Sequence, residues 1–129
     1  MHHLRLLVAD DERDTVLTLS AILRDAGHSV HGVYNGDDVL KAVHLMRPDA
    51  IILDIEMPGM SGYAIAQQLK SIFYGARAPL LIAISGKWVR PSEKILALVV
   101  GFDHHCTKPC DPQHLLKLLE PLAAGETAP

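Results

Sequence analysis

Apolar residues in this chain gather into five short runs, and each run is followed by a longer stretch in which apolar residues recur with helical spacing. We expect the runs to form β-strands over Leu4–Ala9, Ser29–Tyr34, Ala50–Asp54, Pro79–Ile84 and Phe102–Thr107. We expect the longer stretches to form helices over approximately Asp11–Ala26, Asp37–Met46, Tyr63–Phe73, Pro91–Val100 and Pro112–Leu122. The chain thus repeats a strand–helix unit.

Turn-forming residues mark the ends of the second predicted helix. Asn35 and Gly36 are typical of a turn, and Asp37 or Asp38 is expected to cap the helix that follows. Pro48 prevents that helix from continuing, because proline disfavours a helical residue before it.

The repeated strand–helix alternation predicts an α/β, doubly wound fold. Runs such as Ala50–Asp54 are apolar at successive positions, which indicates strands buried on both faces and therefore a parallel sheet between two helix layers. Each crossover is expected to be right-handed. We expect a single domain over residues 1–129, with its core at about 4–122 and a frayed tail at 123–129.

Composition narrows the class of protein. The 129 residues are 49% hydrophobic and 21% charged, which is ordinary for a globular domain. The net charge of −3 lacks the excess of basic residues that is typical of a nucleic-acid-binding domain. Nothing approaches the roughly 20 apolar residues that span a bilayer, and the apolar start of the chain is too short for a signal peptide. Two cysteines are too few for the disulfide framework of a small secreted domain, and we expect both to be reduced thiols. We therefore expect a cytoplasmic protein without direct DNA binding.

Polar residues stand at the ends of four predicted strands. Asp10 and Asp11 follow the first strand, Asp54 ends the third, and Ser85 and Lys108 follow the fourth and fifth. Ligands of doubly wound folds bind beyond the carboxyl ends of the strands, so these side chains are expected to share one rim.

Three carboxylates at one rim repel one another, and Lys108 supplies a single positive charge. A divalent cation, or raised pKa values, would have to relieve the repulsion. Mg²⁺ favours a few carboxylates together with waters and a phosphate oxygen. The pattern therefore points to phosphoryl chemistry, in which a cation and a lysine shield an attacking carboxylate.

The motifs at these strand ends resemble those of the receiver domains of bacterial two-component response regulators. They are Val8-Ala9-Asp10-Asp11-Glu12, Leu53-Asp54-Ile55-Glu56-Met57-Pro58-Gly59-Met60-Ser61-Gly62, Ser85-Gly86 and Thr107-Lys108-Pro109. Each motif alone is weak evidence for this family, but the four motifs in this order, each at the end of the expected strand, are highly specific for it. The resemblance covers about residues 4–122 and implies a CheY-like, flavodoxin-like three-layer sandwich with strand order 2-1-3-4-5 and five helices.

The resemblance also implies roles for the acids. Asp54 would accept a phosphoryl group from the phosphohistidine of a sensor histidine kinase or histidine phosphotransfer protein. Asp10, Asp11 and Asp54 would hold Mg²⁺ together with the backbone carbonyl of Glu56. An alternative for Asp10 and Asp11 is simple stabilisation of the following helix through its dipole.

Further phosphoryl contacts follow from the same resemblance. Ser85 would donate its hydroxyl to a phosphoryl oxygen, and Lys108 would pair with the phosphoryl group, with a cis peptide bond to Pro109. The alternatives are a turn role for Ser85 and a solvated surface position for Lys108.

His105 departs from the resemblance, because the family commonly has tyrosine or phenylalanine at this switch position. An imidazole can still swing between two positions, and its titration would make the output sensitive to pH. A plain surface histidine is the alternative. His104, Cys106 and Cys110 lie nearby in sequence. Successive strand residues point to opposite faces, which argues against a transition-metal site there.

Two charged residues flank the predicted pocket. Glu56 and Lys87 each lie two residues after a site residue, Asp54 and Ser85 respectively. We expect the pair to close across the pocket mouth and slow water attack, although exposed ion pairs are weak.

The predicted helix 91–100 is unusually apolar. Ile95, Leu96, Leu98, Val99 and Val100 span more than half of its circumference. A surface helix needs a narrower stripe, so the surplus indicates a homodimer or effector interface on the face formed by helix four, strand five and helix five. A helix covered locally by its neighbours is the alternative.

The function expected is a phosphorylation switch rather than a turnover enzyme. Three other hypotheses stay open. The chain could be a small aspartyl-phosphate hydrolase, because Asp54-Ile55-Glu56 resembles an acid-x-acid motif. It could be a flavin carrier of the same topology, although that would need a phosphate-binding loop in place of Asp10-Asp11-Glu12, or an adaptor that is not phosphorylated. The chain could also be a receiver domain excised from a hybrid histidine kinase.

Overall fold

The computed structural model describes residues 3–73, 77–86 and 90–123. Its strands are β1 (Arg5–Ala9), β2 (Ser29–Val33), β3 (Ala50–Asp54), β4 (Leu80–Ser85) and β5 (His104–Thr107). Its helices are α1 (Arg13–Asp25), α2 (Gly36–Met46), α3 (Gly62–Ile72), α4 (Pro91–Val100) and α5 (Pro112–Ala123). All strand pairs are parallel, and the sheet order β2-β1-β3-β4-β5 confirms the predicted topology.

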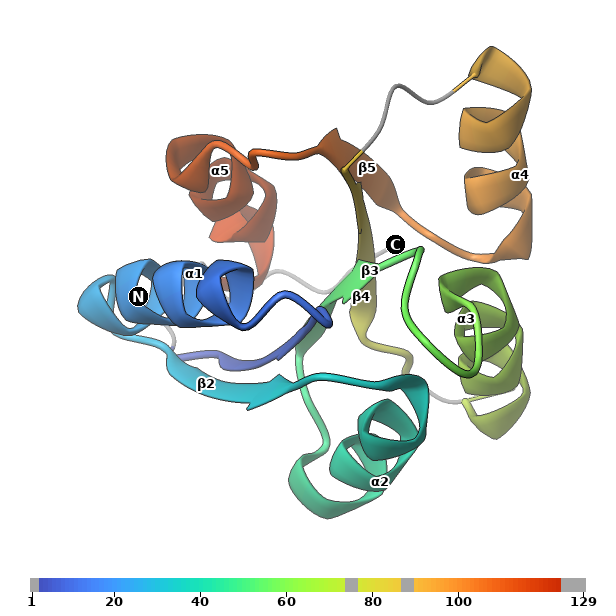
Figure 1. The fold of residues 1–129 in the computed structure, drawn as a ribbon. Helices are drawn as coiled ribbons and strands as arrows, with labels where there is room; N and C mark the ends of the chain where they lie inside the picture. The colour runs from blue at the N-terminus through green and yellow to red at the C-terminus, as the bar shows by residue number, and fades with distance from the viewer. Residues whose placement is uncertain (1–2, 74–76, 87–89, 124–129) are drawn as a thin grey trace.

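Two helix layers enclose the sheet, with α1 and α5 on one side and α2, α3 and α4 on the other (Figure 1). Side chains alternate along each strand, so Leu6 and Val8 pack beneath α1 and α5 while Leu7 and Ala9 face the other layer. The residues of β3 are buried on both faces, as their uninterrupted apolar run predicts.

One predicted helix cap is wrong. Asn35, rather than Asp37 or Asp38, caps α2, and its side-chain oxygen accepts a hydrogen bond from the Asp38 backbone N–H at 2.9 Å. Asn35 has an extended backbone, which the residue before a helix requires. Asp37 and Asp38 instead lie in the first helical turn, where their charges favour the helix dipole.

The end of the chain differs slightly from expectation. Ala123, predicted to begin a frayed tail, is the last residue of α5 and is buried, and residues 124–129 lie outside the described residues. No helix in the described ranges is long and apolar enough to cross a bilayer.

Acid should destabilise the fold through His28, which is buried where β1 begins and accepts a hydrogen bond from the Leu4 backbone N–H. Burial, and then the nearby His3, lowers the pKa of His28 below 6.5. The unfolded chain therefore takes up the proton first, and this stability is present above pH 6.5 and lost as the pH falls. We expect the wild-type unfolding midpoint to fall from neutral pH to about pH 5.

In His28→Asn, which keeps an acceptor but cannot titrate, that fall should be smaller. Denaturant titrations at several pH values measure it. His44→Asn changes an exposed histidine of α2 and is the matched control. An equal acid response of wild type and His28→Asn would remove His28 as the cause.

Candidate phosphoacceptor and metal site

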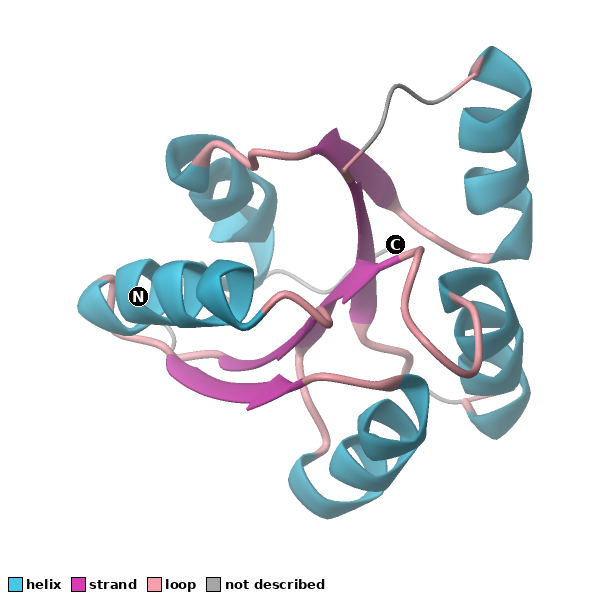
Figure 2. Cartoon of the chain, in the orientation of Figure 1, coloured by secondary structure: helices cyan, strands magenta, loops and turns pink. Residues whose placement is uncertain are grey.

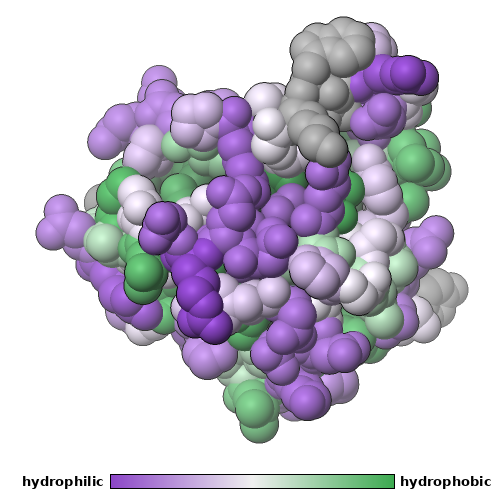
Figure 3. Space-filling view, in the orientation of Figure 1, coloured by the Kyte–Doolittle hydropathy of each residue, from purple (hydrophilic) through white to green (hydrophobic). Residues whose placement is uncertain are grey.

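The carboxyl ends of the strands carry the polar pocket that the sequence predicts. The strands end beneath the loops drawn in pink in Figure 2, and hydrophilic side chains cover the centre of this face (Figure 3). Strands β1 and β3 are neighbours, with Ala9 paired to Leu53, so the residues that follow them are brought together. Carboxylate oxygens of Asp10, Asp11 and Asp54 all lie within 4.8 Å of one another.

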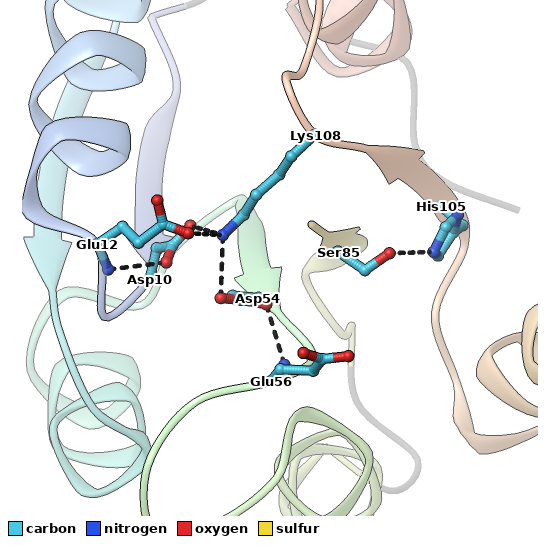
Figure 4. Close-up of polar contacts among 7 residues, drawn as sticks. All are labelled: Asp10, Glu12, Asp54, Glu56, Ser85, His105 and Lys108. Atoms are coloured by element: carbon cyan, nitrogen blue, oxygen red, sulfur yellow. Dashed lines mark hydrogen bonds and ion pairs between the residues drawn. The ribbon is translucent and has the colours of Figure 1, made fainter. Parts of the chain in front are cut away.

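Backbone amides orient the two buried acids. Asp10 Oδ1 accepts a hydrogen bond from the Glu12 N–H at 2.9 Å, and Asp54 Oδ1 accepts one from the Glu56 N–H at 2.9 Å (Figure 4). Each carboxylate is therefore tied at one oxygen by the residue two positions later, a local turn that aspartate readily forms. The second oxygen of each faces the pocket. Asp11 is exposed and precedes α1, which begins at Arg13.

Lys108 joins this pocket from the loop after β5. Its Nζ lies 2.7 Å from Asp10 Oδ2, 3.1 Å from Glu12 Oε1 and 3.2 Å from Asp54 Oδ2 (Figure 4). The Lys108–Pro109 peptide bond is cis, as predicted. Glu12 was missed as a site residue, although its place directly after Asp10-Asp11 is a signal that could have found it.

Burial and neighbouring charges together shift the pKa values of Asp10 and Lys108. Burial raises the pKa of the Asp10 carboxyl above 3.8 and Lys108 opposes that rise, while the negative charge of Asp54 adds to it. Burial tends to lower the pKa of Lys108, but its contacts with Asp10, Glu12 and Asp54 outweigh burial and raise it well above 10.5. Lys108 is therefore a permanent cation at neutral pH.

The donor set fits a hard divalent cation. One lysine faces four carboxylates, counting the exposed Asp11, so negative charge remains in excess. Asp10 Oδ2 is fully buried and forms an ion pair with Lys108, yet has no hydrogen bond of good geometry. Each of the three acids offers one carboxylate oxygen within 4.8 Å of the other two, and carboxylate oxygens are ligands that Mg²⁺ prefers. Among the described residues, this trio is the group whose metal-binding atoms converge.

A small pocket beside these acids has room for an ion and a phosphoryl group. Its volume is about 300 Å³, and it is lined by Asp11, Glu12, Asp54, Glu56, Gly86 and Lys108. The predicted partner of Glu56, Lys87, lies outside the described residues, so the pairing across the pocket mouth stays a prediction.

Ser85 ends β4 next to β3, but its hydroxyl is engaged elsewhere. Ser85 Oγ lies 3.2 Å from Nε2 of His105 on β5 and points away from Asp54 (Figure 4). Ser85 is buried and His105 is half-buried, so this histidine is not fully exposed to solvent; its role as a switch stays a prediction.

Gly62 keeps the loop after Asp54 in place. A Cβ at this position would lie 2.7 Å from Ile55 Cα and 3.0 Å from the Asp54 carbonyl oxygen, so backbone would have to move. We expect Gly62→Ala to lower the free energy of unfolding by about 1–3 kcal/mol.

Denaturant titration measures this loss. Gly86→Ala is the matched control, because among the described residues its added Cβ would meet only the Lys108 side chain, at an ordinary 3.6 Å. Equal stability of Gly62→Ala and wild type would show that the loop accommodates the methyl group.

The surplus apolar surface predicted for α4 is present. Ile95, Leu96, Leu98 and Val99 are exposed, with Val99 at 69%, while Ala97 and Val100 face the core. Apolar surface shows at the edge of the molecule where α4 lies (Figure 3). Coverage of this helix by its neighbours is therefore wrong for these four residues.

The fold and the pocket together define a class of protein: a CheY-like α/β domain with acids and a lysine gathered at the carboxyl edge of its sheet. The model of the response regulator receiver domain family matches residues 6–120. This chain therefore belongs to the response regulator receiver domain family of two-component systems.

Relatives and solved structures agree with this assignment. Protein PilH of Pseudomonas aeruginosa is 30% identical over 94% of this chain and 98% of its own length. Response regulator MprA of Mycobacterium avium is 33% identical over 92% of this chain, which spans only 50% of that protein. The structure of the chemotaxis response regulator CheY4 of Vibrio cholerae superposes with a TM-score of 0.81 at 26% identity, covering 94% of this chain and 99% of that one.

Proposed function

We propose that this receiver domain accepts a phosphoryl group on Asp54 from the phosphohistidine of a sensor histidine kinase or histidine phosphotransfer protein. The observation that carries the proposal is the meeting of Asp54 with Asp10, Asp11 and Lys108 in one pocket. Asp10, Asp11, Asp54 and the backbone carbonyl of Glu56 are the groups that would hold Mg²⁺.

The chemistry is a transfer between two nucleophiles. A carboxylate oxygen of Asp54 attacks phosphorus, the phosphorus–nitrogen bond of the donor breaks, and its electron pair stays on the donor imidazole, which takes up a proton. Bound Mg²⁺ would supply positive charge that offsets the repulsion between the carboxylates and the phosphoryl oxygens. Lys108 Nζ, already 3.2 Å from Asp54 Oδ2, is placed to pair with the new charge.

The product is a switch. A phosphoryl group adds almost two negative charges and several strong acceptors beside Lys108. These shift an equilibrium between two conformations only as far as they bind one of them better. The exposed apolar face of α4, with β5 and α5, is the surface on which we expect affinity for an effector or a second copy to change.

Receiver domains are generally not catalytic enzymes, and slow loss of the phosphoryl group to water is the only turnover we propose. Family membership does not favour the aspartyl-phosphate hydrolase considered above. We also propose that residues 1–129 act as one domain in the cytoplasm. MprA is about twice as long as the matched segment, so attachment to further domains stays open.

The test uses a small-molecule donor. Incubation with acetyl phosphate and Mg²⁺, followed by intact mass measurement, should show one phosphoryl adduct per chain. Omission of Mg²⁺ and addition of a chelator should suppress the adduct. No adduct under any condition, or one that forms equally well without a divalent cation, would contradict the proposal.

A further inference from the structure

The contact between Ser85 and His105 ties a predicted phosphoryl-binding hydroxyl to a titratable ring. Ser85 Oγ and His105 Nε2 are 3.2 Å apart, and Ser85 is only 2% exposed. In the strand register His105 is opposite Ala83, two residues before Ser85. Figure 4 shows the hydroxyl directed at the ring rather than at Asp54.

A serine hydroxyl has one hydrogen, so it can donate to only one acceptor at a time. When Nε2 of a neutral imidazole carries no proton, Ser85 donates to it and has nothing left for a phosphoryl oxygen. When Nε2 carries a proton, the ring donates, Ser85 Oγ accepts, and the hydroxyl hydrogen is released. A doubly protonated ring always donates from Nε2.

We propose that His105 is a positioning residue that gates Ser85: gain of a proton by its ring turns Nε2 into an obligatory donor and frees the Ser85 hydroxyl for the phosphoryl group on Asp54. This inference rests on the proposed function of Asp54 and adds a control that a phenol or phenyl ring at position 105 could not supply, because neither titrates in this pH range.

The surroundings of His105 set where this gate operates. Cys106, the next residue of β5, packs in the core beneath α1 and α5, so His105 faces the α4 side of the sheet. Ser85 faces it from β4, and Lys94 of α4 is the charged group among the described residues whose field shifts its pKa. Burial first, and then Lys94, lowers the pKa of His105 below 6.5, so the ring is neutral in the resting protein at pH 7.

We expect phosphorylation to oppose this lowering of the His105 pKa. Negative charge added at Asp54 favours the protonated ring, and the freed Ser85 hydroxyl favours the phosphoryl group. By linkage, the free energy by which phosphorylation favours protonation of His105 equals the free energy by which protonation favours the phosphorylated state. Mild acid should therefore promote phosphorylation, and phosphorylation should raise the pKa of His105.

Two measurements test this. The first compares the rate of adduct formation from acetyl phosphate with Mg²⁺, followed by intact mass from about pH 5.5 to about pH 8, in wild type, His105→Phe and Ser85→Ala. Division by the His105→Phe rate cancels the pH dependence of the donor and of cation binding. The wild-type ratio should rise about three- to tenfold on acidification, the range of one hydrogen bond, whereas the Ser85→Ala ratio should stay flat.

The second measurement follows the ring itself. The ¹H–¹³C signal of His105, assigned by its loss in His105→Phe, gives the pKa of the ring in free and phosphorylated wild type. We expect a higher pKa of His105 in the phosphorylated protein. This pKa is read in wild type, and His105→Phe is needed only to assign the signal.

The outcomes separate the two levels of the argument. Parallel pH profiles for wild type and His105→Phe, or a His105 pKa unmoved by phosphorylation, would overturn the gate and leave Asp54 phosphorylation intact. Absence of an adduct in every variant at every pH would overturn the proposed function as well.

Discussion

Asp54→Asn should reduce the phosphoryl adduct formed with acetyl phosphate and Mg²⁺ to background. The substitution keeps the shape of the side chain, but an uncharged carboxamide is a poor nucleophile towards phosphorus. Asp54 is almost fully buried at the end of β3, and its Oδ2 lies 3.2 Å from Lys108 Nζ, so the proposed acceptor oxygen is already beside the cation. Intact mass measurement reports the loss directly.

The matched control for this substitution is Asp37→Asn, which removes an exposed aspartate from the first turn of α2. It should phosphorylate like wild type. Circular dichroism should show that Asp54→Asn remains folded, because the substitution removes one of the repelling charges. A full adduct on Asp54→Asn would assign the acceptor to another residue.

Lys108→Met should destabilise the protein by about 3 kcal/mol at neutral pH without divalent cations, in addition to slowing phosphorylation. Lys108 is the cation beside the fully buried Asp10, and breaking a buried ion pair costs about 3–5 kcal/mol. Methionine fills similar volume, so the loss comes mainly from charge. Mg²⁺ should restore part of the stability, because it binds the folded state only.

Denaturant titrations with chelator and with Mg²⁺ measure both effects. Lys117→Met, at an exposed position of α5, is the control and should change stability by less than about 0.5 kcal/mol. Stability of Lys108→Met equal to that of wild type in chelator would show that the acids do not depend on this lysine.

Sequence predicts this fold well because its main signal is burial. The apolar runs of β1, β3 and β4 leave no polar face, and these three are the inner strands between two helix layers, whereas the more polar β2 and β5 lie at the edges. The cap of α2 was harder, since Asn35, Asp37 and Asp38 are all good cap residues. Only the backbone conformation at Asn35 distinguishes them.

The location of the acids was equally predictable, because the topology of a parallel sheet places the carboxyl ends of its strands at one edge. The side-chain rotamers were not predictable. That Lys108 also reaches Glu12, and that Ser85 turns to His105, depends on the β4–β5 register and on side-chain torsions that no sequence pattern reports. The role of Glu56 with Lys87 rests on residues partly outside the described ranges.

Mg²⁺ titration of the unphosphorylated protein tests the central claim most directly. Asp10, Asp11 and Asp54 are held to form one cation site, and Asp11 is the exposed member that can be changed without disturbing the core. Calorimetry should show one saturable site per chain in wild type and its loss in Asp11→Asn. Absence of saturable binding, or unchanged affinity in Asp11→Asn, would contradict the account.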